Sequence, residues 1–326
     1  MLPDRGTPHV FITGVAGFIG SALAQHLLGA GFKVSGLDNF SYGSREQVQN
    51  LLKYPEFQFF EADLEAFTFP RGCKPDAIVH LASLKIPRYG NALNTLQHNT
   101  AGVERVCQWS LEHQAHLLFT STSDVYGLST VIPFHEESPT AIGNPAVPRW
   151  SYALSKLYGE HLIHALAEAK GLRFTIARLF GTYGPGQRYD WWGGPQGVFL
   201  RLAAAGETLE VHGDGQQTRC FIYISDTVKA LQLLLEHPAA KGQIVNVGAF
   251  PDEEISMLNL AKMLWTSIRP NEEARIKLVP YSQFGRYEDV QRRVPDLQKI
   301  SAMGFLPEVR LNEGLMRLRD YYLSTR

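Results

Sequence analysis

The sequence of 326 residues has little cysteine, no excess charge of either sign and no long apolar segment. Its three cysteines, Cys73, Cys107 and Cys220, are odd in number and far apart, which excludes a disulfide framework and a cysteine metal site. A formal net charge of −1 excludes the basic surface typical of nucleic-acid binding or of attachment to an anionic membrane. No apolar run could cross a bilayer, and no secretion signal is seen. These absences predict a cytoplasmic protein without a metal and without a nucleic-acid or membrane partner.

The chain is longer than one hydrophobic core usually serves, so we expect one large α/β unit with a second lobe. Hydrophobic residues make up 44% of it and charged residues 19%, which is an ordinary composition for a globular protein.

A glycine-rich turn follows the first predicted strand, the apolar run at residues 9–13. A Gly-x-x-Gly-x-x-Gly pattern at residues 14–20 comes directly after that run, and a helical pattern covers residues 18–30. The first two glycines allow a tight turn and close approach to a pyrophosphate, and the third lets the helix pack closely on the strand. The positive end of the helix then faces the phosphates. The predicted cofactor-binding residues of this turn are Gly14, Gly17, Phe18, Ile19 and Gly20.

Polar residues mark the ends of the next predicted strands. Residues 33–38 end in Asp38, where a carboxylate would accept hydrogen bonds from both ribose hydroxyls and would repel a 2′-phosphate. Asp38 therefore favours NAD over NADP. The other cofactor contacts predicted at strand ends are Asn39, Asp63, Leu64, Leu81 and Ala82.

Strands and helices alternate along the first half of the chain. Further strands are predicted over residues 57–63, 76–82, 116–122 and 173–179, and helices over residues 94–112 and 151–170. This alternation predicts an α/β fold with a doubly wound parallel sheet, in which ligands bind at the carboxyl ends of the strands.

Tyr152 and Lys156 stand four residues apart on the predicted helix over residues 151–170, so their side chains share one helical face. A nearby cation stabilises phenolate. We therefore expect Lys156 to lower the pKa of Tyr152 and to make this tyrosine a base.

Together these residues resemble the extended short-chain dehydrogenase/reductase superfamily, in its NAD-dependent epimerase/dehydratase branch, from Val10 to about Leu318. The resemblance implies a Rossmann-type sheet, a smaller C-terminal α/β substrate lobe and tightly bound NAD. It implies an NAD-binding domain at residues 1–180 plus about 220–250, and a nucleotide-sugar lobe at residues 181–219 and 251–326. The residues that it implies at the active site are Thr122, Tyr152 and Lys156 as catalytic groups, with Asn99 as the structural asparagine beside the cofactor.

The second half carries the expected substrate contacts. Residues 181–197 are rich in glycine and predict a loop, and Gly181 stands where family members commonly have an asparagine that touches substrate. Trp191 and Trp192 either stack on a nucleobase or sugar or anchor a hydrophobic lid. Arg219 is expected to clamp a diphosphate, for which a guanidinium fork is suited. The other predicted substrate contacts are Lys85, Thr122, Arg292 and Arg293.

The resemblance leaves several reactions open, all on a nucleotide-diphosphate sugar, which we expect to be a UDP-sugar. Thr122, Ser123 and Asp124 stand where decarboxylases typically read Thr-Ser-Glu and dehydratases Thr-Asp-Glu, and the residues before Tyr152 also resemble the decarboxylase branch. Our first expectation is a 4-epimerase, because the aspartate is one methylene shorter than that glutamate. The alternatives are a UDP-glucuronate decarboxylase or a 4,6-dehydratase and, in other classes, an oxidoreductase that consumes free NAD or a non-catalytic NAD-binding regulator. The family also implies a homodimer.

Overall fold

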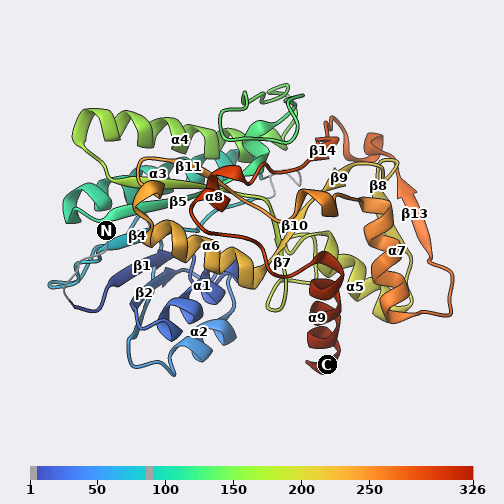
Figure 1. Ribbon diagram of the computed structural model, residues 1–326, viewed down its shortest axis with the longest axis horizontal. Coiled ribbons are helices and arrows are strands. Elements are labelled where there is room, and N and C mark those ends of the chain that lie inside the picture. The colour runs from blue at the N-terminus through green and yellow to red at the C-terminus, as the bar shows by residue number, and fades with distance from the viewer. Residues whose placement is uncertain (1–5, 86–90, 326) are drawn as a thin grey trace.

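A seven-stranded parallel sheet forms the centre of the computed structural model, which describes residues 6–85 and 91–325 (Figure 1). The strand order is β11-β6-β5-β4-β1-β2-β3, so the chain reverses its direction of winding between β1 and β4. This order is that of a Rossmann-type doubly wound sheet and confirms the predicted fold class. The strands are β1 (His9–Thr13), β2 (Lys33–Asp38), β3 (Phe57–Glu61), β4 (Ala77–His80), β5 (His116–Thr122), β6 (Phe174–Leu179) and β11 (Ile244–Val247).

Helices cover both faces of this sheet (Figure 1). The helices are α1 (Phe18–Gly29), α2 (Arg45–Leu51) and α6 (Ile224–Glu236) on one face, and α3 (Ala92–His113) and α4 (Trp150–Lys170) on the other. Strand β1 is buried along its whole length, as expected for a strand with helices on both sides. Its side chains alternate, so Val10 and Ile12 pack with Leu27 of α1, whereas Phe11 packs with Trp109 of α3.

The second half of the chain adds a smaller region beside the sheet (right side of Figure 1). Its strands pair as β7 (Gly181–Tyr183) with β10 (Phe221–Tyr223), β8 (Leu209–His212) with β13 (Ile276–Val279), and β9 (Thr218–Arg219) with both β12 (Ile255–Ser256) and β14 (Arg292–Arg293). Its helices are α5 (Pro195–Ala205), α7 (Met257–Ile268) and α9 (Leu311–Ser324), whereas α8 (Gln298–Ala302) lies beside β11 of the large sheet.

The glycine-rich stretch at residues 181–197 is more ordered than its composition predicts. Gly181 begins β7, which pairs with β10, and Pro195 occupies the first turn of α5. A proline at this position fits a helix because its missing N–H would have had no intrahelical partner. Among residues 6–85 and 91–325, no helix is both long enough and apolar enough to cross a membrane.

Candidate active site

The turn between β1 and α1 forms a cradle for an anion. Gly14 has a φ of +76°, and the Gly17 N–H donates to the Gly14 carbonyl oxygen at 3.1 Å. Gly17 is the N-cap of α1 but has no side chain to cap the helix, and the first turn, which contains Phe18 and Ile19, carries no acidic residue. The N–H groups of this turn and the positive end of the helix dipole therefore suit a phosphate.

Gly20 sets how closely α1 approaches this turn, which gives a direct test. A Cβ atom at Gly20 would lie 2.1 Å from the carbonyl oxygen of Gly14, whereas one at Gly29, in the same helix, meets nothing within 4 Å. We expect Gly20→Ala to lower the free energy of unfolding by about 1–3 kcal/mol and to weaken NAD binding, because backbone must move. The control Gly29→Ala should bind NAD normally and be as stable as wild type or more so. Urea unfolding and NAD titration distinguish the two, and equal stabilities would contradict the close approach.

The predicted ribose carboxylate lies beside the glycine turn. Asp38 ends β2 and accepts hydrogen bonds from the N–H groups of Ala16, at 3.0 Å, and Phe40, at 2.8 Å. Burial raises its pKa, and these backbone N–H groups oppose the rise. Asn39 donates to the Asp63 carboxylate at 2.6 Å, which joins the ends of β2 and β3.

The remaining strand-end residues complete the cofactor edge. Leu81 and Ala82 follow β4 and donate their N–H groups to the carbonyl and hydroxyl oxygens of Thr13. The Ser83 hydroxyl is buried and has no partner among the described residues. Leu64 packs against the core cluster around Phe11. A phosphate cradle, a ribose carboxylate and an unpaired hydroxyl on adjacent strand ends fit NAD.

Tyr152 and Lys156 lie one turn apart at the start of α4, and Thr122 ends β5. Tyr152 and Thr122 share a hydrogen bond. Lys156 is buried and donates from Nζ to the Thr120 carbonyl oxygen at 2.9 Å. Burial lowers the pKa of Lys156 to about 7, which Glu160 opposes.

The pKa of Tyr152 differs from the expectation. Burial raises it, Asp124 adds to the rise, and Thr122 and Arg293 oppose it. The reason is that the lysine ammonium is directed to the Thr120 carbonyl, so in the protein alone desolvation of the phenol outweighs the cation's effect.

The Asn99 side chain forms hydrogen bonds to other parts of the protein. Its side chain accepts a hydrogen bond from the Leu84 N–H and donates to the Leu84 carbonyl and to the Ser155 hydroxyl. Both amide hydrogens are thereby used, so Asn99 joins the segment after β4 to the catalytic helix.

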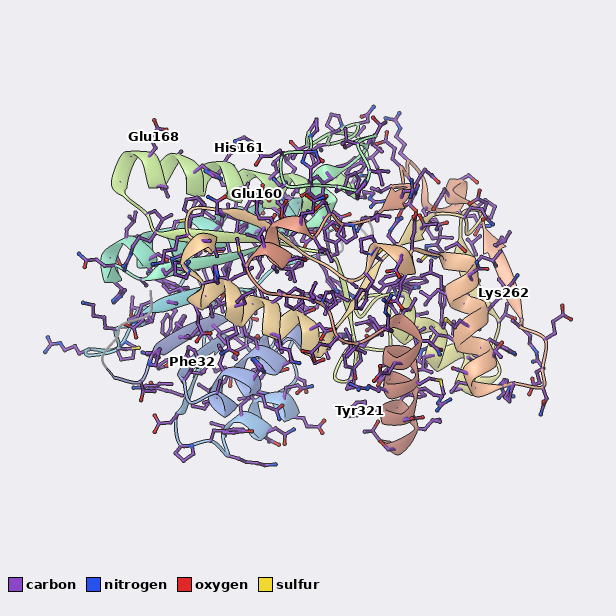
Figure 2. All side chains as sticks on the ribbon, viewed as in Figure 1. Phe32, Glu160, His161, Glu168, Lys262 and Tyr321 are labelled. Carbon is purple, nitrogen blue, oxygen red and sulfur yellow. The ribbon has the colours of Figure 1, made fainter. Side chains whose placement is uncertain are left out.

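A buried ion pair fixes α4 on the sheet. Arg178 of β6 donates from Nε and Nη2 to the two oxygens of Glu160, at 3.0 and 2.6 Å, and Ser121 donates to the same carboxylate. Figure 2 shows Glu160 on the inner side of α4, whereas His161 and Glu168 point outward.

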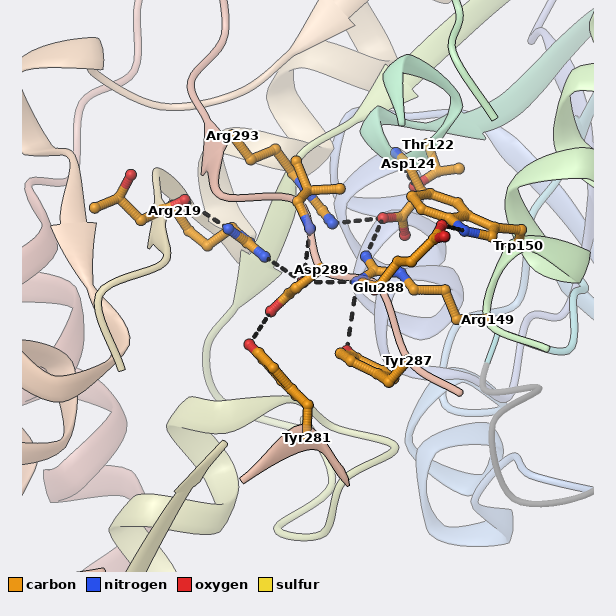
Figure 3. A network of polar contacts seen from close by, with 12 residues as sticks. Thr122, Asp124, Arg149, Trp150, Arg219, Tyr281, Tyr287, Glu288, Asp289 and Arg293 are labelled. Carbon is orange, nitrogen blue, oxygen red and sulfur yellow. Dashed lines mark hydrogen bonds and ion pairs between the residues drawn. The ribbon is translucent and has the colours of Figure 1, made fainter. Parts of the chain in front are cut away.

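Five charged side chains form an alternating chain on the substrate side of Tyr152 (Figure 3). In order they are Arg219, Asp289, Arg149, Asp124 and Arg293, with N–O distances of 3.1, 2.6, 3.3 and 2.5 Å. We call these residues the charge ladder. Three arginines face two aspartates, so the ladder has one excess positive charge and a cation at each end.

Both carboxylates of the ladder are ionised. Burial alone would raise the pKa of Asp124, but Arg293 and Arg149 outweigh it and the pKa is lowered. The pKa of Asp289 is lowered in the same way by Arg219 and Arg149. Burial and Arg293 lower the pKa of Arg219 to about 10.

Sequence reasoning assigned only Arg292 and Arg293 of the segment around β14 to the site and gave no role to Asp289. Tyr281 donates to Asp289, Tyr287 accepts from Arg149 at 3.4 Å, and Glu288 accepts from the Trp150 indole N–H at 2.6 Å. These contacts join the segment before β14 to the start of α4. No periodic pattern in the sequence marks that segment, and its proximity to α4 arises only from tertiary packing.

The two neighbouring arginines of β14, Arg292 and Arg293, have different surroundings. Arg293 and Arg219 lie in the charge ladder, but Arg292 is exposed and forms two hydrogen bonds with Glu254, at 2.8 and 2.7 Å. Consecutive residues of a strand point to opposite faces, and both arginines belong to β14. Arg293 therefore belongs to the charge ladder, whereas Arg292 pairs with Glu254 and does not, and its predicted substrate contact stays a prediction.

The other predicted substrate contacts have mixed surroundings. A Cβ at Gly181 would lie 2.7 Å from the Phe221 ring, so close packing explains the glycine.

The two tryptophans of the loop both pack on other aromatic rings. The centroid of the Trp191 ring lies 4.6 Å from that of His212, and the centroid of the Trp192 ring lies 4.3 Å from that of Tyr42. This arrangement favours the anchoring role. Lys85 lies within electrostatic reach of Asp190 and Arg188. The Ser123 hydroxyl, beside Asp124, is buried without a partner among the described residues.

The dinucleotide cradle and the Thr122, Tyr152 and Lys156 side chains at one sheet edge define a dinucleotide-dependent enzyme of the short-chain dehydrogenase class. Residues 10–248 match the family model described as the NAD dependent epimerase/dehydratase family, and the chain belongs to that family.

Relatives of known activity are nucleotide-sugar enzymes. The chain is 32% identical to UDP-glucuronic acid decarboxylase 1 of Danio rerio over 98% of this chain and 74% of the relative. It is 32% identical to a UDP-N-acetyl-alpha-D-glucosaminuronate decarboxylase of Bacillus cytotoxicus over 95% and 96%. Among solved structures, the UDP-glucose 4-epimerase of Thermotoga maritima matches with a TM-score of 0.83 at 26% identity, covering 97% of this chain and 99% of that one. The UDP-glucuronic acid 4-epimerase of Bacillus cereus, solved with UDP-glucuronic acid and NAD, matches with a TM-score of 0.86 at 26% identity, covering 98% and 100%.

These findings confirm the family, the use of NAD and the nucleotide-sugar substrate. The chain is an NAD-dependent nucleotide-sugar enzyme of the epimerase/dehydratase type.

Proposed function

We propose that the chain is a decarboxylase of a UDP-hexuronic acid. The observation that carries this proposal is the Asp124 carboxylate beside Tyr152, bound by Arg149 and Arg293 at 3.3 and 2.5 Å. A neutral sugar has no use for guanidinium groups at its reacting end, whereas a uronate carboxylate does. The curated relatives named above, which are uronate decarboxylases, add support.

Held by the Gly14–Gly20 turn and Asp38, NAD would supply the acceptor for the hydride of C4 and its donor for the return step. Tyr152 Oη accepts the proton of the 4-hydroxyl, and Thr122 Oγ1 bonds the same oxygen. The resulting C4 carbonyl is β to the C6 carboxylate. The C5–C6 bond therefore breaks with its electron pair moving toward O4, where Tyr152 supplies a proton and carbon dioxide leaves. C5 then takes a proton from water, because the Asp124 carboxylate is ionised and has none to give, and O4 returns its proton to Tyr152 for the last step.

Mass spectrometry of the product tests this proposal. We expect purified enzyme with bound NAD to remove the mass of carbon dioxide from UDP-glucuronate and to leave the mass of UDP-glucose unchanged. Asp124→Asn should lose most of this activity, because the variant leaves Arg149 and Arg293 without their carboxylate. Accumulation of NADH in proportion to product would instead indicate an oxidoreductase that consumes NAD.

The second candidate is a 4-epimerase, favoured by the match to solved 4-epimerases over nearly the whole chain. It predicts a product of unchanged mass that elutes separately. Loss of the mass of one water would indicate a dehydratase. Either result would overturn the decarboxylase proposal.

We also propose that the two domains predicted from the sequence bind different ligands. Residues 1–180 with about 220–250 bind NAD, and residues 181–219 and 251–326 bind the nucleotide-sugar. Strand β11 belongs to the large sheet although it lies in the second half of the chain, which supports adding residues 220–250 to the NAD-binding domain.

We further propose a homodimer formed through α3 and α4. Leu154 is 47% exposed and Tyr158 38% exposed on the outer side of α4, and Leu162 and Leu166 are half-buried there. Apolar side chains gathered on one outer helix face are typical of a protein interface.

Substitution of Leu154 tests the dimer. Leu154→Glu should shift the protein to monomer in sedimentation velocity, since a desolvated carboxylate at the interface has no partner. Leu323 on α9 is similarly exposed, at 54%, and Leu323→Glu should leave the assembly unchanged. A wild-type protein that sediments as a monomer at all concentrations would rule out the interface.

A further inference from the structure

We propose that Asp289 is a positioning residue that holds Arg219 and Arg149 at a fixed spacing, so that nucleotide binding and the acidic sugar are presented together to Tyr152. The proposal deepens the proposed function and rests on it for the acidic sugar.

The contacts of Asp289 leave its carboxylate little freedom. Oδ1 accepts hydrogen bonds from Arg149 at 2.6 Å, from Arg219 at 3.1 Å and from the Val290 N–H at 2.8 Å. Oδ2 accepts from the Tyr281 hydroxyl at 2.5 Å. Only 7% of the side chain is exposed. Asp289 is thus bound on both oxygens, by four hydrogen bonds.

The partners come from distant parts of the sequence. Arg149 precedes Tyr152 by three residues at the start of α4, and Arg219 lies on β9 in the smaller region. Figure 3 shows Asp289 between them. The next residue back, Glu288, accepts from Arg149 through its carbonyl oxygen and from Trp150 through its carboxylate, so the backbone that carries Asp289 is itself fixed to α4.

The negative charge of Asp289 and its position between two arginines have opposite expected effects on ligand binding. Asp289 neutralises part of the ladder's positive charge, which by itself weakens attraction for an anionic ligand. We infer that Asp289 instead serves to orient the two arginines, because without it Arg149 and Arg219 would repel one another and separate. Interactions with the remote nucleotide can then be used to order the reacting end.

The test therefore compares affinity with turnover. In NAD-loaded enzyme we expect Asp289→Asn to lower kcat at least about tenfold, because small displacements of positioned groups cost much rate. Its Kd for UDP should be unchanged or lower, since one negative charge is removed next to two guanidinium groups. Asp289→Glu should restore the wild-type Kd for UDP but not kcat, because it restores charge without spacing. Asp320→Asn, an exposed aspartate paired with Arg319, is the matched control and should change neither.

Tyr281→Phe keeps the proposal testable if Asp289→Asn does not fold. It removes one hydrogen bond on the side away from the arginines, and we expect a drop in kcat of about threefold or more with no loss of UDP affinity. Wild-type kcat in the folded Asp289 or Tyr281 variants would overturn the proposal. So would losses of UDP affinity and thermal stability in parallel with kcat, which indicate a structural role only.

The readouts also separate this proposal from the decarboxylase assignment. UDP affinity is measured without any sugar, and kcat is measured with whichever nucleotide-sugar the wild type turns over. Conversion of a neutral sugar alone would refute the decarboxylase. The Asp289 comparison would still show, on that sugar, whether the arginines need to be positioned.

Discussion

Tyr152→Phe is expected to lower kcat by a factor of about 10²–10⁴, because the variant keeps the ring but loses the group that accepts the 4-hydroxyl proton. The hydroxyl removed is the one bonded to Thr122, and the variant retains the half-buried ring. NAD binding should persist, since the cofactor edge formed by Gly14 and Asp38 is unchanged. Steady-state kinetics and NAD titration of the variant measure the two effects separately.

A tyrosine elsewhere on the surface supplies the control for this experiment. Tyr321 on α9 is 39% exposed, and Tyr321→Phe should have wild-type kcat. Retention of a tenth or more of wild-type activity by Tyr152→Phe would refute the assignment of this tyrosine as the base.

The second large effect is expected on stability. Glu160→Ala should lower the free energy of unfolding by about 3–5 kcal/mol, because it leaves the buried Arg178 guanidinium without its carboxylate. Both side chains of this pair are at most 4% exposed. Urea unfolding of NAD-free protein measures the change.

The same helix offers a matched control for Glu160. Glu168 lies two turns further along α4, on the outer side (Figure 2), and Glu168→Ala should change stability by no more than about 0.5 kcal/mol. A similar small change for Glu160→Ala would mean that the Arg178–Glu160 pair contributes little.

The fold could be predicted because its signals are local. Strands β1, β2 and β5 begin and end at the predicted residues, since each is a buried apolar run ended by glycine, acid or hydroxyl residues. Parallel strands bring their carboxyl ends to one edge, so Gly14, Asp38 and Thr122 could be grouped without a structure.

The substrate side was less accessible to sequence reasoning because its contacts are not local. Asp289 lies 140 residues from Arg149, and only the packing of the segment before β14 on α4 brings them together. The difference between Arg292 and Arg293 depends on which face of a two-residue strand each occupies, and no longer pattern fixes that register. Gly181 is explained by the Phe221 ring, another contact between distant residues.

The burial of Lys156 makes folding and proton release dependent on each other. Its pKa falls from the ordinary 10.5 to about 7 because burial disfavours the ammonium form. Between these values the unfolded chain holds a proton that the folded chain has released, so the contribution of Lys156 to the free energy of unfolding rises with pH in this window. The ammonium, which the sequence predicts to support ionisation of Tyr152 during catalysis, is lost in the folded protein as pH rises through about 7, at the lower end of this window. Alkaline solution therefore favours the fold at Lys156 while it weakens the catalyst, and thermal stability and turnover respond to pH there in opposite directions.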